Sequence, residues 1–132
     1  MELVLEEYVS DHLVKGLVPY YIYNIIVENH EVGRLVYRNG SDEECYFDGH
    51  IGYTIYEEYR GHHYAYHACL LLKDIIDKDY VYITCSKDNQ ASLKTIMKLD
   101  AEYIEEKEIP AKLKKFYHKD EYIKMIFKWR LK

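Results

Sequence analysis

The sequence predicts an α+β domain in which a mixed, mostly antiparallel sheet of six to seven strands carries two main helices. Four segments rich in β-branched and aromatic residues come first. Two segments with apolar residues spaced three and four apart follow, separated by one strand, and two further strand-like segments end the sequence. With 132 residues, the chain fits one domain, 1–132, large enough to bury a core without a metal or a disulfide.

The N-terminal part contains four predicted strands. Glu28-Asn29-His30 is a short turn, so the second and third strands should form a hairpin, and Asn39-Gly40 is a strong turn signal. Residues 10–18 are a brief polar connection with room for one helical turn, and 41–48 are an acidic loop or irregular strand. The predicted strands are Leu3–Val9, Tyr20–Val27, Glu31–Tyr37 and His50–Tyr56.

The C-terminal part changes period. Apolar residues from Ala65 to Ile76 and from Leu93 to Leu99 mark two helices, the second capped by Asp88 or Asn89. The three remaining predicted strands are Tyr80–Cys85, Ala101–Ile109 and Lys124–Leu131, with a charged connection over 111–121.

Charge and cysteine usage narrow the class of protein. Residues 1–106 hold 9 basic and 20 acidic side chains, so an acidic body argues against a nucleic-acid partner. No apolar run approaches the roughly 18 residues of a membrane span, and Met1-Glu2-Leu3 lacks the basic start of a signal peptide. The three cysteines, Cys45, Cys69 and Cys85, predict free thiols in a reducing cytoplasm.

The chemistry is expected where the strand ending near Tyr56 runs through a short loop into the helix at Ala65. Unpaired amides at a helix N-terminus bind phosphate, and Gly61 and Ala65 would let a pyrophosphate approach the backbone. The alternative is an ordinary strand-to-helix turn. His62, His63 and His67 also allow a metal interpretation, but no carboxylate stands between them, and no metal is expected.

Two motifs resemble the GNAT acyltransferase superfamily. Arg60-Gly61-His62-His63-Tyr64-Ala65 is similar to the family's Arg/Gln-x-x-Gly-x-Gly/Ala. A strand is then followed by Asn89, by Ser92 and by an ending, Lys98-Leu99-Asp100-Ala101, that is similar to the family's Lys-Leu-Gly-Phe. The pattern is closest to the ribosomal-protein-alanine-acetyltransferase-like branch.

The resemblance implies a site for acetyl-CoA, or CoA, as acetyl donor to an amine acceptor. The amides of Arg60, Gly61, His62, His63, Tyr64 and Ala65 would hold the pyrophosphate. The strand edge at Ile55 and Tyr56 would pair with the pantetheine arm, to which Asn89 would donate a hydrogen bond. Ser92 would donate to the sulfur, or is simply a first-turn hydroxyl of the helix.

The sequence departs from the family pattern in three places. His63 replaces the central loop glycine and is tolerated only at some cost if that position needs a positive φ. Asp100 replaces a turn glycine. The helices that wall the acceptor side in many relatives have only about ten residues available here, so the N-terminal helical region is shortened. The acceptor side is then open, or a second subunit completes it in a homodimer.

The expected reaction requires a group that removes a proton from the amine, and this requirement indicates the candidate catalytic residues. An alkyl amine is less than about 0.1% neutral at pH 7, so a base or a water chain must remove a proton. His50 is the candidate base, although it shares a face with Gly52 and Thr54 and needs a bulge to face the site; a structural histidine is the alternative. Glu57 and Glu58 are weaker candidates. Ile96 stands where many relatives have a tyrosine that protonates the thiolate.

The sequence therefore predicts a cytoplasmic acetyl-CoA-dependent N-acetyltransferase. Asp42, Glu43, Glu44 and Asp48 would attract a cationic amine, or are a solvated loop. Two rival functions are a catalytically inactive CoA-binding or regulatory module with the same fold, and a structural domain without a CoA site.

Overall fold

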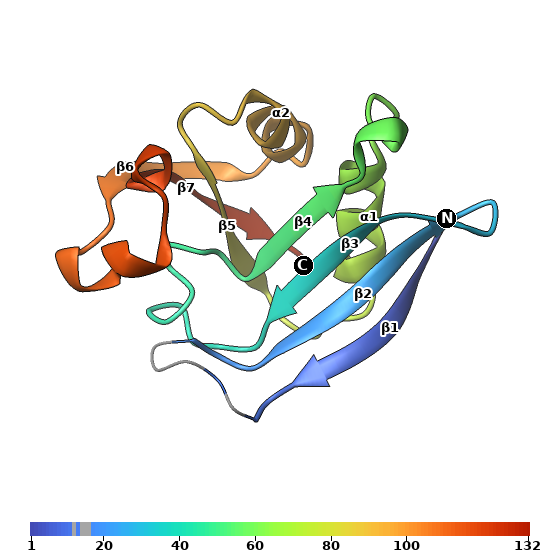
Figure 1. Ribbon diagram of the computed structural model, residues 1–132, viewed down its shortest axis with the longest axis horizontal. Helices are drawn as coiled ribbons and strands as arrows, with labels where there is room; N and C mark the ends of the chain where they lie inside the picture. Colours follow the sequence, from blue (N-terminus) through green and yellow to red (C-terminus); the bar gives the residue numbers. More distant parts are fainter. Residues whose placement is uncertain (12, 14–16) are drawn as a thin grey trace.

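The computed structural model describes residues 1–11, 13 and 17–132, and its strands form two antiparallel sheets (Figure 1). The first sheet contains, in order, β1 (Glu2–Val9), β2 (Tyr20–Val27), β3 (His30–Arg38) and β4 (Ile51–Ile55). The second contains β5 (Tyr80–Ser86), β7 (Ile123–Arg130) and β6 (Glu102–Glu108) in that order. The predicted α+β class is confirmed, but the expected central sheet is divided in two.

In the part of the chain that the structure describes, two α-helices accompany the sheets, α1 (Tyr64–Lys73) and α2 (Gln90–Lys98). Short 3-10 helices, η1 (Glu57–Tyr59), η2 (Ala111–Phe116) and η3 (Lys119–Glu121), lie in connections. Asn89 is the N-cap of α2, as predicted, and its side chain accepts a hydrogen bond from the Ser92 amide. None of the helices in the described residues is both long and apolar enough to span a membrane.

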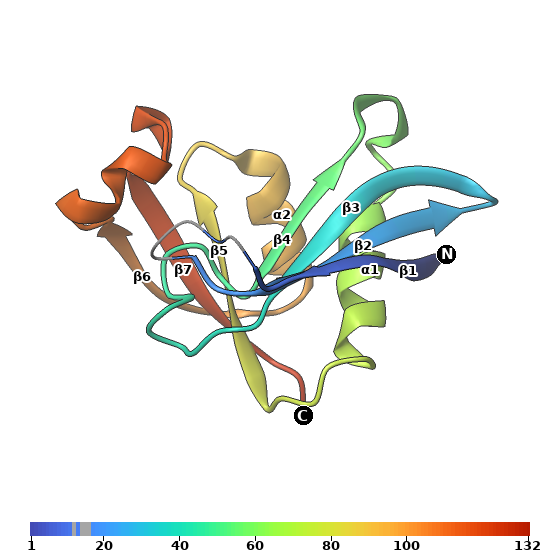
Figure 2. The same ribbon diagram turned by 60° about the horizontal axis from the view of Figure 1, so that its bottom comes forward.

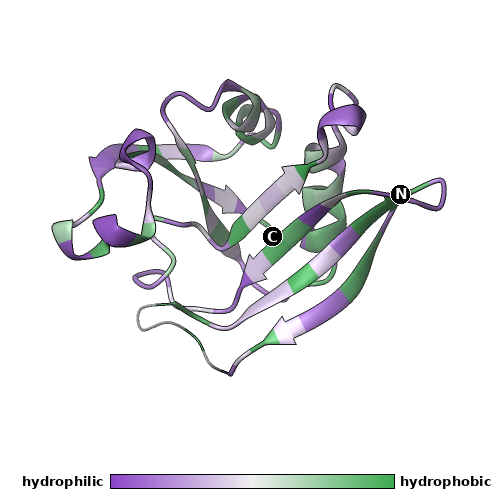
Figure 3. Ribbon diagram, in the orientation of Figure 1, coloured by the Kyte–Doolittle hydropathy of each residue, from purple (hydrophilic) through white to green (hydrophobic). Residues whose placement is uncertain are grey.

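The hydrophobic core lies between the first sheet, the second sheet and the inner faces of the helices (Figure 3). Ala68, Cys69 and Leu72 of α1 are completely buried against a sheet whose central side chains, such as Ile25 and Leu35, are also completely buried. Burying each large aliphatic side chain contributes about 1.5–3 kcal/mol. Cys45, Cys69 and Cys85 are free and buried, which agrees with the predicted thiols.

The two sheets meet at Gly49 and His50. The His50 amide donates to the carbonyl of Tyr82 at 2.8 Å. Gly49 has a φ of +77°, and a Cβ there would lie 3.1 Å from the Thr84 nitrogen, so only glycine allows β5 to approach this closely. From this junction β4 and β5 run in similar directions and diverge, with α2 beside the opening (Figure 2).

Several boundaries differ from the sequence prediction. Residues 42–48 form consecutive turns, which agrees with the predicted loop and not with its alternative, an irregular strand. The strand predicted over His50–Tyr56 is shorter, because β4 begins after His50 and ends at Ile55. The charged connection over 111–121 contains η2 and η3. The predicted helical turn within 10–18 lies mostly outside the described residues, because 12 and 14–16 are not among them.

Candidate active site

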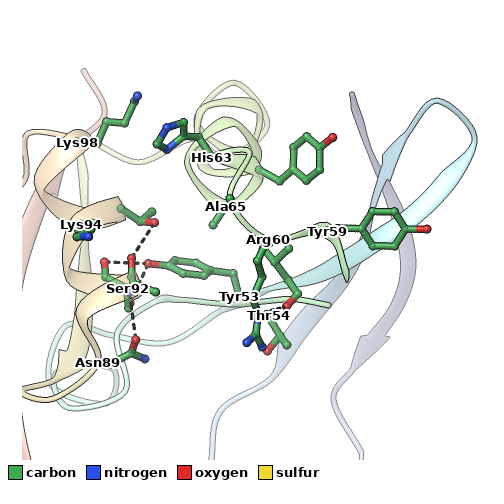
Figure 4. A pocket seen from close by; sticks show the side chains of 15 residues that line it. Tyr53, Thr54, Tyr59, Arg60, His63, Ala65, Asn89, Ser92, Lys94 and Lys98 are labelled. Carbon is green, nitrogen blue, oxygen red and sulfur yellow. Dashed lines mark hydrogen bonds between the residues drawn. The ribbon is translucent and has the colours of Figure 1, made fainter. Parts of the chain in front are cut away.

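A pocket of about 530 Å³ lies between the end of β4, the loop into α1, and α2 (Figure 4). It combines side chains from three segments that are distant in sequence. Thr54 and Ile55 come from β4, Gly61 and His63 from the loop, and Asn89 from the start of α2. The divergence of β4 from β5 provides the opening in which this pocket forms.

The loop into α1 is held by its own backbone geometry. Arg60 donates from Nε to the carbonyl of Ile55 at 3.0 Å, which closes the loop over the end of β4. Gly61 has a φ of +91° and His63, the N-cap of α1, has a φ of 59°. The His63 side chain makes no capping bond, so the first-turn amides of α1 keep their capacity to bind an anion.

The side chains that line the pocket include four basic residues. Arg60, His63, Lys94 and Lys98 line it, and no aspartate or glutamate among the described residues does so. In Figure 4 the His63 imidazole lies on the side of the pocket that faces Lys98. Basic side chains beside the positive end of a helix dipole favour a phosphate-bearing ligand.

Asn89 and Ser92 form the wall contributed by α2. The Asn89 Oδ1 atom accepts from the Ser92 amide at 3.1 Å, so the cap uses the amide oxygen and leaves the amide nitrogen for a ligand carbonyl. Ser92 lines the same pocket. One helix start therefore presents two hydrogen-bonding side chains to the cavity.

Tyr53 is a residue of this site that sequence reasoning missed. Its ring extends from β4 towards the first turn of α2 (Figure 4), and its hydroxyl lies 2.9 Å from the Ser92 Oγ. Burial raises the pKa of Tyr53 well above its ordinary value of 10.0. The available signal was strand parity, because Ile51, Tyr53 and Ile55 share the face that the helices cover.

His50 does not reach the pocket. Its side chain is completely buried, Nδ1 accepts from the Tyr82 amide at 2.9 Å, and Nε2 lies 3.2 Å from the Gly40 carbonyl. The pairing of β3 with β4 has no register shift, so the bulge that a catalytic orientation required is absent from this strand pair. Burial lowers the pKa of His50, and both ring nitrogens are occupied, which does not fit the predicted role of general base.

Most of the other predicted cofactor residues gather in the pocket, but two do not. The hydroxyl of Tyr56 donates to Glu31, and the His62 ring stacks on Tyr64 with centroids 5.2 Å apart. Neither Tyr56 nor His62 is among the residues that line the pocket. Those that do line it are Ile55, Arg60, Gly61, His63, Tyr64, Ala65, Asn89 and Ser92.

The remaining candidates lie outside the pocket. Ile96 is completely buried in the core, and Glu57 and Glu58 lie exposed on η1. In the acidic loop, Asp42 accepts from the Tyr80 hydroxyl and Asp48 from the Tyr117 hydroxyl. These two carboxylates therefore tie the loop to the second sheet and its connection, in place of a fully solvated loop.

Comparison with known proteins agrees with this geometry. Residues 5–102 match the profile of the family described as "Acetyltransferase (GNAT) domain". No curated protein matches the chain significantly.

Three solved structures share the fold, all of RimL, a ribosomal L7/L12 alpha-N-protein acetyltransferase. An apo form has 18% identity and a TM-score of 0.66 over 85% of this chain and 70% of its own. A coenzyme A complex has 19% identity and a TM-score of 0.65 over 84% and 62%. A second apo form has 19% identity and a TM-score of 0.66 over 84% and 60%. The chain thus spans between 60% and 70% of the length of these proteins.

At this identity the likeness to RimL shows a shared fold, whereas the family profile spans most of the chain and includes the loop, Asn89 and Ser92. The pocket has the cationic loop and the helix start that a phosphate-bearing donor requires. The chain therefore belongs to the GNAT acetyltransferase family, whose acetyl donor is acetyl-CoA.

Proposed function

We propose that this protein transfers an acetyl group from acetyl-CoA to a primary amine by direct attack of the amine on the thioester. The observation that carries the proposal is the convergence of the Arg60–Ala65 loop, Asn89 and Ser92 on one pocket beside the divergence of β4 and β5. The loop amides, with Arg60 and Lys98, would hold the pyrophosphate. Asn89 would donate its amide N–H to the pantetheine arm.

The backbone of β4 supports a place for the acetyl end. The carbonyl of His50 and the amide of Tyr56 are bonded to β3, at 2.7 and 2.9 Å. Because bonded and non-bonded residues alternate in an antiparallel pair, the amides of Tyr53 and Ile55 point to the open edge beside β5. Either amide would stabilise the oxyanion of the tetrahedral intermediate.

The residues that line the pocket limit the groups that could remove a proton from the amine. His50 is buried and neutral, and the described residues lining the pocket include no carboxylate. We propose that the proton leaves through water to the solvent, so the neutral fraction of the amine controls the rate. The value of kcat/KM should then rise about tenfold per pH unit until the acceptor's own pKa is reached.

The acceptor is proposed to be the free α-amine of a peptide or protein, because the proteins that share the fold are described as alpha-N-protein acetyltransferases. A small-molecule amine is the second candidate of the same chemistry. A different function, a CoA-binding module without turnover, is favoured because the described residues of the lining include no carboxylate that could act as general base, and His63 is the one imidazole among them.

Calorimetric titration with acetyl-CoA and with CoA, followed by detection of thiol release with a panel of peptide and small-molecule amines, tests the proposal. Micromolar binding of acetyl-CoA and of CoA, together with thiol release that requires an amine, would support the proposed acetyltransferase activity. Tight binding without thiol release for any amine would support the binding module. An absence of binding at millimolar CoA would remove both.

A further inference from the structure

The pair formed by Tyr53 and Ser92 lines the pocket where a strand and a helix approach each other. Tyr53 comes from the middle of β4, and Ser92 is the third residue of α2, so their contact at 2.9 Å crosses the opening between the two elements. The Tyr53 ring packs against the hydrophobic core, and the Ser92 amide is fixed by Asn89. The core therefore restricts movement of Tyr53, and the bond to Asn89 restricts movement of Ser92.

The contact has a preferred direction. The Tyr53 O–H donates to the Ser92 carbonyl at 3.4 Å, and at 2.9 Å from the Ser92 Oγ either oxygen can be the donor. Because a phenol is a stronger hydrogen-bond donor than an alcohol, we assign the donation in this second contact to Tyr53 and the acceptance to the Ser92 Oγ. The Ser92 hydrogen is then available to a third group, and Ser92 lines the pocket. When the Ser92 Oγ accepts the hydrogen bond from Tyr53, rotation of the Ser92 hydroxyl is restricted, and its hydrogen can point in fewer directions.

We propose that Tyr53 is a positioning residue that directs the Ser92 hydroxyl to the sulfur of CoA and so stabilises the departing thiolate. This inference rests on the proposed function. In that reaction the C–N bond forms, the C–S bond breaks, and the electron pair of the C–S bond goes to sulfur. The Ser92 O–H then donates a hydrogen bond to the sulfur anion, and the proton released by the amine neutralises the thiolate through solvent.

Donation of a hydrogen bond, rather than transfer of the proton, fits the chemistry of the pair. Burial keeps Tyr53 protonated far above the pH at which an ordinary thiol ionises, about 8.5. Neither hydroxyl is acidic enough to give its proton to a thiolate, yet a hydrogen bond to a charged acceptor is stronger than one to a neutral acceptor. Position 96 on α2 is a completely buried isoleucine, so the phenol in contact with Ser92 comes from the strand instead.

The test measures the pKa of the thiol of CoA bound to the protein and needs no acceptor. CoA carrying ¹³C at the methylene beside sulfur is titrated with pH by NMR in complex with the wild type, Tyr53→Phe, Ser92→Ala and the double variant. The wild type should lower the thiol pKa. Ser92→Ala should raise it by about one pH unit, the effect of one hydrogen bond to a charged group.

Tyr53→Phe keeps the ring and should raise the thiol pKa in the same direction, with an unchanged Kd for CoA at a pH well below that pKa, where the bound sulfur is a thiol in both proteins. Because Tyr53 acts through Ser92, the double variant should titrate like Ser92→Ala alone. Tyr66→Phe, on α1 outside the pocket, is the matched control and should titrate like the wild type.

Three outcomes would overturn the inference: a Tyr53→Phe titration equal to that of the wild type, additive effects of the two substitutions, or CoA that does not bind the wild type. The last would remove the proposed function as well. A Tyr53-dependent thiol pKa without transfer to any amine would instead retain the pair and refute the proposed turnover.

Discussion

The Nδ1 atom of His50 accepts a hydrogen bond from the backbone amide of Tyr82 at 2.9 Å, while its Nε2 atom lies 3.2 Å from the carbonyl of Gly40. This arrangement requires the neutral tautomer with hydrogen on Nε2. One imidazole thereby joins the start of β4 to β5 and to the loop after β3. It fixes the point from which the two strands diverge.

His50→Ala should destabilise the fold rather than remove a catalytic base. The substitution leaves the half-buried Tyr82 amide without its acceptor and creates a cavity at the completely buried imidazole, a combined loss of about 3 kcal/mol. Urea denaturation measures this difference, with His50→Asn as the conservative comparison that retains an acceptor near Nδ1. A variant of wild-type stability that has selectively lost turnover would return His50 to the role of base.

Acid should destabilise the protein through the same histidine. The pKa of His50 is lowered in the fold by burial, whereas in the unfolded chain it is about 6.5. The stabilisation is therefore fully present above pH 6.5 and is lost as pH falls through the depressed folded pKa, because the unfolded chain binds the proton first. Thermal melts between pH 7.5 and 5 should show a steeper fall in Tm for the wild type than for His50→Asn. Parallel curves would contradict this.

Asn89 has two functions that one substitution separates. Serine is as good an N-cap as asparagine, so Asn89→Ser should keep the stability of α2 within a few tenths of a kcal/mol. It removes the amide N–H proposed to bind the pantetheine arm, which should weaken CoA binding roughly fivefold. Calorimetry measures the affinity. Asn89→Ala, the comparison that loses both functions, should also cost about 1 kcal/mol of stability. Wild-type affinity in Asn89→Ser would refute the pantetheine contact.

The periodicity of apolar residues predicted the strands and helices because it depends on the local conformation of each segment. The alternation in β2 and β3, and the helical spacing from Ala65 to Leu72, each depend on which face of one element is buried. The hairpin turn at Glu28 and Asn29, both with positive φ, was likewise visible as a local signal. The division into two sheets was not, because it depends on the approach of β5 to Gly49, far away in sequence.

In the candidate site, too, the features that depend on neighbouring residues were predictable from the sequence, and those that depend on contacts between distant residues were not. The loop residues and Asn89 belong to continuous motifs, and the structure brings them together. The role of His50 depends on partners 10 and 32 residues away, and the contact of Tyr53 with Ser92 spans 39 residues. Strand parity alone gave the correct facing of Tyr53, and the assumed bulge concealed it.

His63→Gly should change stability and affinity in opposite directions. A side chain at a φ of 59° costs about 1–2 kcal/mol, part of which glycine returns as entropy of the unfolded chain, so the variant should be more stable by about 0.5–1 kcal/mol. The imidazole, however, lines the cationic pocket opposite Lys98 (Figure 4), and its loss should weaken CoA binding roughly fivefold. Denaturation and calorimetry on the same sample measure the two effects.

Gly61→Ala is the matched control for the backbone term, because Gly61 has a φ of +91° and open space around an added Cβ. That variant should lose about 1 kcal/mol of stability without removing a side chain from the pocket. Tighter CoA binding in His63→Gly would show that the histidine only strains the phosphate loop, whereas weaker binding would show that the imidazole takes the place of a backbone contact that the family obtains from glycine.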